Sequence, residues 1–109
     1  AMRAKGLGDG VSELGGQTVY VKDGEARLKD GTLAGSVLVM NIAVKNLVEK
    51  AGVPFEKAID CATKNPAMNL GVYDKLGSIK EGKTADFAVL DKDFNVIMTI
   101  REGEIIYKA

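Results

Sequence analysis

Apolar residues in the middle of the chain recur with the period of an α-helix. The pattern predicts a first helix from about Ser36 to Ala51, which Gly52 ends. Pro54 suits the first turn of a second helix, and Asn65–Pro66 ends it because the residue before a proline avoids helical geometry. The segment PAMNLG predicts one more short helical turn. The two apolar faces consist of Val37, Met40, Val44, Leu47, Val48 and Ala51, and of Phe55, Ala58, Ile59 and Ala62.

Alternating and β-branched stretches predict strands on either side of these helices. TVYVKDGEARL indicates a hairpin, because Asp23-Gly24 supplies the residues that a tight primed turn requires. ADFAVLD, NVIMTIR and EIIYK predict three strands, joined by a turn over residues 91–95 and a tighter turn at Glu102-Gly103. The hairpin and these strands could pair into one sheet, with the helices elsewhere. Residues 1–16 are rich in glycine without periodicity, which predicts an irregular loop.

The length and composition are those of a globular α/β or α+β chain. With 109 residues it makes one ordinary domain at most, and 46% of the residues are hydrophobic and 28% charged. The second helix and the hairpins carry more apolar surface than a chain of this length covers. A piece of a larger fold explains this better than a free-standing domain.

The charge balance speaks against nucleic acid and anionic membranes as partners. Fifteen basic residues offset fifteen acidic ones, and they are interspersed along the chain. We expect no signal peptide and no transmembrane segment. The single cysteine, Cys61, forms no internal disulfide, which agrees with a cytoplasmic location. Cys61 is expected to be buried, and Met2, Met40, Met68 and Met98 to fill the core.

Two motifs need to be weighed against their structural context. Residues 77–84, GSIKEGKT, match the phosphate-loop pattern G-x-x-x-x-G-K-[ST]. That chemistry needs a strand before the loop and a helix after it, whereas the strand ADFAVLD follows here. A strand-to-strand turn with solvated lysines is therefore the preferred interpretation. Asp86 follows this turn and is expected to bond backbone amides rather than do acid–base work. The glycines of residues 6–10 are a weaker hint of a nucleotide loop.

Two long stretches resemble one family closely. They are DGTLAGSVLVMNIAVKNLVEKAGVPFEKAIDCATKNPAMNLGV and LGSIKEGKTADFAVLDKDFNVIMTIREGEIIYK. Both are similar to the carboxyl-terminal part of the bacterial N-acetylglucosamine-6-phosphate deacetylases, a family of metal-dependent amidohydrolases. The resemblance implies a fragment of a (β/α)₈ barrel with a small β-sandwich. Residues 1–72 would form the end of the barrel and residues 73–109 the carboxyl-terminal strands of the sandwich.

The loop DGTLAGS, residues 30–36, carries the candidate substrate contacts. Barrel enzymes bind substrates on loops at the carboxyl ends of their strands, and this loop resembles one that lines the family's sugar pocket. Its small residues let the backbone approach a ligand closely. The resemblance therefore implies that Thr32, Leu33 and Ala34 offer backbone amides and carbonyls to the substrate. The alternative is a loop that only caps the following helix through Ser36.

The family's catalytic machinery is expected to lie outside this sequence. The chain contains no histidine, and the resemblance places the Glu and His metal ligands, and an Asp acid/base just before Ala1, upstream. The parent would use a divalent metal such as zinc or iron, hydrolyse N-acetylglucosamine 6-phosphate, and be a cytoplasmic homodimer. This segment would hold no catalytic residue and no metal, would pack against the rest of the barrel, and would be inactive alone. The alternative is a non-enzymatic remnant or interaction module.

Overall fold

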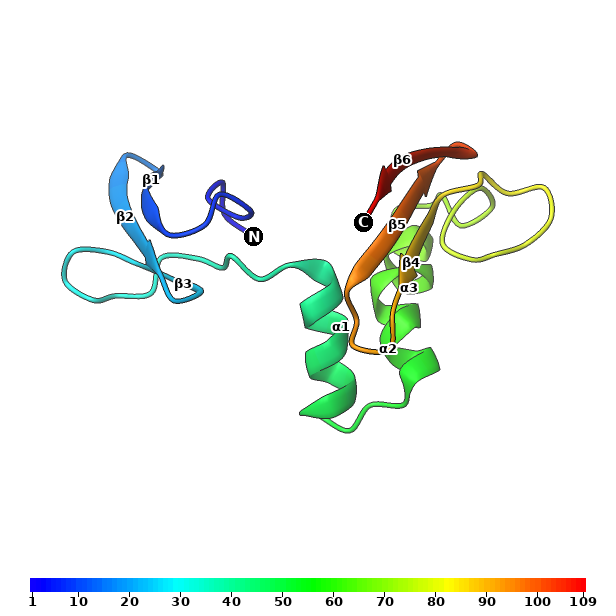
Figure 1. Cartoon of the computed structure of the whole chain (residues 1–109), viewed down its shortest axis with the longest axis horizontal. Coiled ribbons are helices and arrows are strands. Elements are labelled where there is room, and N and C mark those ends of the chain that lie inside the picture. Colours follow the sequence, from blue (N-terminus) through cyan, green and yellow to red (C-terminus); the bar gives the residue numbers. More distant parts are fainter. The chain divides into compact units, whose positions relative to one another are not determined.

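The computed structural model describes the whole chain, residues 1–109, and divides into two compact units (Figure 1). The first unit, Ala1–Val39, contains only strands, and the second, Met40–Ala109, contains helices and strands. The chain is therefore of the α+β class. Its elements are β1 Gly10–Leu14, β2 Gln17–Lys22, β3 Glu25–Arg27, α1 Met40–Glu49, α2 Phe55–Ala62, α3 Lys64–Asn69, β4 Phe87–Leu90, β5 Val96–Arg101 and β6 Glu104–Lys108.

The predicted hairpin is confirmed as β2 and β3. The two strands are antiparallel, with Lys22 opposite Glu25. Asp23 and Gly24 form the turn with φ angles of 52° and 77°. Positive φ at both central residues is what a type I′ turn requires, and aspartate and glycine adopt it most readily.

The prediction that residues 1–16 form only an irregular loop is wrong for the second half of that segment. Gly10–Leu14 forms β1, an edge strand that pairs antiparallel with β2. Gly15 and Gly16 make the connecting turn with φ angles of 59° and 81°. The apolar alternation in GVSEL is poor because most of this edge strand is exposed, and the strand exists because β2 offers it a pairing edge.

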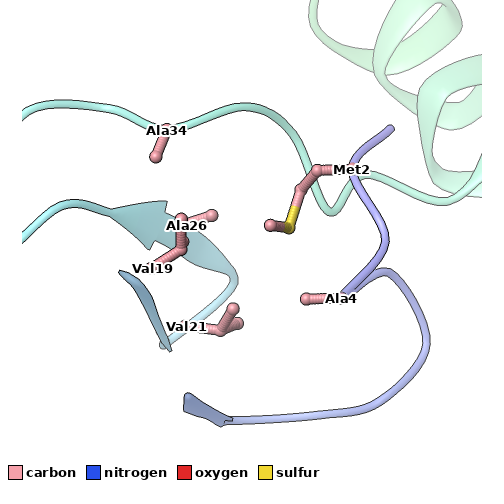
Figure 2. Close-up of a cluster of buried hydrophobic side chains, with 6 residues drawn as sticks. All are labelled: Met2, Ala4, Val19, Val21, Ala26 and Ala34. Carbon is pink, nitrogen blue, oxygen red and sulfur yellow. The ribbon is translucent and has the colours of Figure 1, made fainter. Parts of the chain in front are cut away.

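The core of the first unit lies on one face of this sheet. Val19 is fully buried and Val21 is 6% exposed, since residues two apart in a strand share a face. Burying one valine side chain stabilises a fold by about 1.5–3 kcal/mol. Figure 2 shows the side chains that converge here, which are Met2, Ala4, Val19, Val21, Ala26 and Ala34.

The first helix begins later than its apolar pattern predicts, at Met40 instead of Ser36. Gly35 has a φ of 97°, and the Ser36 carbonyl accepts a hydrogen bond from the Met2 amide at 2.8 Å. The Ser36 hydroxyl accepts from the Leu38 amide at 3.1 Å, in a local turn. These bonds hold the segment before Met40 in a non-helical path, so Ser36 is not the cap of α1.

The second helix is confirmed as α2, but its end lies earlier than Asn65–Pro66. Thr63 interrupts the helical path with φ −129° and ψ −79°, and its hydroxyl donates to the Ile59 carbonyl at 2.7 Å. Pro66 then falls in the first turn of α3. The first turn tolerates proline because its amides lack intrahelical partners in any case.

The three predicted carboxyl-terminal strands are confirmed as β4, β5 and β6, in that order in one antiparallel sheet. The prediction of a single sheet is wrong, because β1, β2 and β3 form a separate one. Glu102 and Gly103 make the tight β5–β6 turn with φ angles of 52° and 87°. The Asp86 carboxylate accepts a hydrogen bond from the Glu102 amide at 2.7 Å, which confirms its predicted backbone-bonding role.

The β4–β5 turn anchors this sheet to the helices of the second unit (Figure 1). Phe94, in the turn, is buried with Val44 of α1 and Ala58 of α2. Its ring lies 6.1 Å from that of Phe55, and its carbonyl accepts a hydrogen bond from Asn41 Nδ2 at 2.9 Å. One turn residue thus ties both longer helices to the strands.

Several side chains predicted to be buried are exposed in this chain. Cys61 is exposed on α2, and Met40 and Met68 are 61% and 55% exposed; of the four methionines only Met2 is buried. Large apolar side chains of the helices, such as Phe55, are thus exposed, so helical periodicity alone misjudges which residues are buried within these 109 residues. None of the helices is long and apolar enough to span a membrane.

We predict that Asp91 stabilises the second unit in a pH-dependent way. Its carboxylate accepts hydrogen bonds from the Asp93 amide and from the amide and side chain of Asn95, at 2.8, 2.8 and 2.9 Å. These bonds, the Asn95 side chain's first, lower the pKa of Asp91 below its ordinary 3.8. Because the pKa is lowered by folding, the stabilisation exists above pH 3.8 and disappears as the pH falls through the folded value.

The Asp91→Ala variant should therefore melt at a lower temperature than the unmodified chain at pH 7, and the difference should shrink below pH 3.8. Thermal unfolding followed by circular dichroism across this range measures it. Asp93→Ala is the matched control, because only the Asp93 backbone takes part in the turn. A pH-independent difference would contradict the prediction.

Candidate functional site

The candidate site is built on a short extension of the β1–β2–β3 sheet. After β3 the chain turns back, and Leu33 forms an isolated antiparallel bridge with Arg27. Two backbone hydrogen bonds flank this bridge. The Leu28 amide donates to the Thr32 carbonyl, and the Ala34 amide donates to the Ala26 carbonyl, both at 2.8 Å. The segment 32–34 therefore lies beside β3 like a fourth, very short strand.

Asp30 and Gly31 make the turn that brings this segment back. Gly31 has a φ of 88°, which favours glycine, and its amide donates to the Leu28 carbonyl at 3.0 Å. The Asp30 carboxylate accepts the Thr32 amide at 3.0 Å. This backbone bond, followed by one from the Thr32 hydroxyl, lowers the pKa of Asp30 below its ordinary value. Aspartate two residues before its amide partner is a common turn former.

The three predicted contact residues differ in what they have left to offer a ligand. The amide and carbonyl of Thr32 and the amide of Ala34 are all used within the protein. The N–H and C=O of Leu33 form no hydrogen bond, since a residue in a non-hydrogen-bonded bridge points both groups away from its partner strand. Leu33 as a whole is 63% exposed. Leu33 thus presents one free donor and one free acceptor.

Ala34 serves the core. Its side chain is 8% exposed and packs with Met2, Val19 and Ala26 (Figure 2). Gly35, which follows, is tightly packed, because an added Cβ would lie 3.3 Å from the Met2 side chain, and its φ of 97° favours glycine. Bulk at Ala34 would therefore disturb the packing under the loop instead of blocking its outer side.

No sequence motif singles out Arg27, which lies at the base of this loop. Its Nε donates to Glu25 Oε2 at 2.8 Å, and its Nη1 donates to the Gly31 carbonyl at 2.7 Å. Only the strand register shows that Arg27 stands opposite Leu33.

The segment that matches the phosphate-loop pattern has a different geometry. Residues 77–84 lie between α3 and β4. The expected strand-to-strand turn is therefore wrong, because a helix precedes the segment; a strand follows it, as expected. The prediction that Lys83 is solvated is also wrong. Its ammonium donates to the carbonyls of Tyr73 and Leu76 and lies 3.6 Å from the centre of the Tyr73 ring. The lysine that would contact a phosphate is thus bound to the protein's own backbone.

At Gly77 the backbone lies close against α3, which no sequence motif indicates. A Cβ at this position would lie 2.6 Å from the Ala67 side chain and 3.0 Å from the Thr63 carbonyl. The glycine is therefore needed for packing on α3.

A shallow hollow lies near this segment and is lined by Tyr73, Asp74, Lys80, Glu81, Gly82 and Lys83. The hydrogen bond from the Ser78 hydroxyl, with smaller charge effects, lowers the pKa of Tyr73.

The chain contains no histidine, the residue type that most often ligates a catalytic metal. No cluster of three or more His, Cys, Asp or Glu side chains stands close enough together to hold a metal ion. The residues present therefore do not fit a resident divalent metal. Among Thr32, Leu33 and Ala34, the backbone groups that form no hydrogen bond within the chain are the N–H and C=O of Leu33 and the C=O of Ala34.

Comparison with known proteins decides the family. A model of the amidohydrolase family matches residues 8–106. The chain belongs to the amidohydrolase family. The N-acetylglucosamine-6-phosphate deacetylase of Bacillus subtilis is 43% identical over 107 residues, which are 98% of this chain and 27% of that protein. This chain thus spans about a quarter of the length of that relative.

Solved structures agree with this assignment. The N-acetylglucosamine-6-phosphate deacetylase of Thermotoga maritima is 44% identical, with a TM-score of 0.87 over 100% of this chain and 30% of its own. A variant deacetylase of Mycobacterium smegmatis, in complex with N-acetyl-D-glucosamine-6-phosphate, is 36% identical with a TM-score of 0.81 over 96% of this amidohydrolase segment and 28% of its own chain. The resemblance seen in the sequence is confirmed.

Proposed function

We propose that this chain is part of an enzyme that hydrolyses N-acetylglucosamine 6-phosphate to glucosamine 6-phosphate and acetate. The observation that supports this most strongly is the match to the Thermotoga maritima deacetylase, which extends over the whole chain at 44% identity and a TM-score of 0.87. A likeness in both sequence and backbone over the full length is more specific than the family pattern alone. In this proposal the enzyme is a cytoplasmic homodimer.

The chain would supply one end of the larger fold. Residues 1–72 would complete a (β/α)₈ barrel and residues 73–109 would add strands to a small β-sandwich. The uncovered apolar surface supports this proposal. Phe55 of α2 and Met68 of α3 are 52% and 55% exposed, and Ile105 and Ile106 of β6 are each 60% exposed. Soluble monomers rarely leave so many large apolar side chains uncovered, so further chain would pack here.

The role of the chain in the reaction would be substrate binding. Amide hydrolysis needs an activated water and a well-placed group that moves its proton. This chain has no histidine, and its carboxylates form no cluster that could hold a metal to activate the water. The divalent metal of the amidohydrolases would be held by residues outside this segment. The Leu33 N–H would donate to, and its C=O accept from, polar groups of the amino sugar, and Thr32 and Ala34 would support them through their ladder bonds.

The chain alone should release no acetate from N-acetylglucosamine 6-phosphate, with or without added zinc, iron or manganese. It should become active when it replaces the matching segment of the Bacillus subtilis deacetylase, with which it shares 43% identity over 107 residues. We name this chimaera the grafted deacetylase. Acetate release is measured for the chain alone and for the grafted deacetylase. An inactive but folded graft would favour the alternative of a non-enzymatic remnant.

A second prediction concerns the free amide of Leu33. Leu33→Pro removes this N–H and leaves both flanking ladder bonds in place, because the ladder uses residues 32 and 34. Loss of one hydrogen bond to the substrate should raise the KM of the grafted deacetylase by about tenfold. Leu33→Ala is the matched control, since it shortens the exposed side chain but keeps the N–H. An unchanged KM in Leu33→Pro would contradict the proposed contact.

A further inference from the structure

Three consecutive peptide groups determine how Leu33 is presented. In the Gly31–Thr32 peptide, the carbonyl accepts Arg27 Nη1 at 2.7 Å and the amide donates to Asp30 Oδ1 at 3.0 Å. Side chains thus hold this peptide group at both ends. In the next two groups, the Thr32 carbonyl and the Ala34 amide are held by the ladder, at 2.8 Å each.

The free groups of Leu33 lie between these held positions. Its N–H belongs to the same peptide plane as the Thr32 carbonyl, and its C=O to the same plane as the Ala34 amide. Each free group is therefore fixed in direction by the bonded group at the other end of its peptide. The Gly31–Thr32 peptide precedes both, and at Gly31, with a φ of 88°, the backbone has the widest conformational freedom in this turn.

Arg27 is placed to remove that freedom. It stands opposite Leu33 in the bridge, and its guanidinium reaches along the sheet to the Gly31 carbonyl. Glu25 Oε2 accepts from its Nε at 2.8 Å, which orients the planar fork toward the loop. Nε is thus held by a carboxylate and Nη1 by a carbonyl of the protein, while the Arg27 side chain stays 43% exposed.

We propose that Arg27 is a positioning residue that, together with Asp30, fixes the Gly31–Thr32 peptide and so aims the free backbone of Leu33 at the substrate. The proposal rests on the proposed function of the loop. It assigns a role in sugar binding to a charged side chain that touches no sugar, acting through the peptide groups that follow it.

The test compares Arg27→Met with Lys29→Met. Both variants remove one positive charge next to the loop, but Lys29 is exposed and makes no hydrogen bond or ion pair in the chain. In the 109-residue chain, the ¹⁵N heteronuclear NOE at Gly31, Thr32 and Leu33 should fall in Arg27→Met and stay unchanged in Lys29→Met. Unchanged values in Arg27→Met would overturn the proposal.

The grafted deacetylase provides a readout that a merely structural role would not give. Arg27→Met should raise KM by about tenfold and leave kcat within about twofold, because binding is lost equally in the ground and transition states. Lys29→Met should change neither. An equal fall in kcat, or no change in KM, would overturn the proposal.

The Leu33→Pro variant separates this proposal from the function on which it depends. If Leu33→Pro raises KM but Arg27→Met does not, the loop binds substrate and the positioning role is wrong. If neither variant raises KM, the proposed substrate contact itself is wrong.

Discussion

The register between β3 and the segment 32–34 is the constraint on which the candidate site depends. In an antiparallel pair, residues alternate between those that exchange backbone hydrogen bonds and those that point these groups outward. Leu33 occupies an outward position opposite Arg27. A shift of one residue would turn the Leu33 backbone inward and bring the Ala34 side chain out of the core.

The core of the first unit holds this register in place. Ala34 packs with Val19 and Ala26, and Gly35 allows the backbone to lie against Met2. At the other end of the segment, the hydrogen-bonded turn at Asp30 and Gly31 fixes the number of residues between β3 and Thr32. The same few residues therefore determine both the packing beneath the loop and the direction of the free N–H and C=O of Leu33. This links a small apolar core to the proposed contact with a polar ligand.

Local elements follow from the sequence where local physics determines them. The Asp23-Gly24 turn and the strands on either side of Glu102-Gly103 were predictable, because turn residues and β-branched alternation act over a few residues. The start of α1 was not, because Ser36 is held outside the helix by a hydrogen bond from Met2, far away in the sequence. Cys61 was expected to be buried from its apolar neighbours, but it lies on the exposed side of α2, whereas Ala58 of the same helix is fully buried.

The candidate site was predictable as a loop and unpredictable in its details. Small residues and the family resemblance indicate residues 30–36, but only the register distinguishes the outward backbone of Leu33 from the inward side chain of Ala34. Arg27 could not be found from the sequence, since its partner is a carbonyl that any residue possesses. Because almost every residue type has the same backbone N–H and C=O groups, the sequence does not indicate which of these groups are free to bind a ligand.

Amide hydrogen exchange of three neighbouring residues in the 109-residue chain tests this account most directly. The amides of Thr32 and Ala34 are hydrogen-bonded to Asp30 and Ala26, whereas that of Leu33 is free. The account predicts slow exchange at Thr32 and Ala34 and fast exchange at Leu33 between them, in a single NMR experiment on the unmodified protein. Protection of Leu33 equal to that of Ala34 would contradict it, because the register would then be different and the Leu33 backbone would not be available to a ligand.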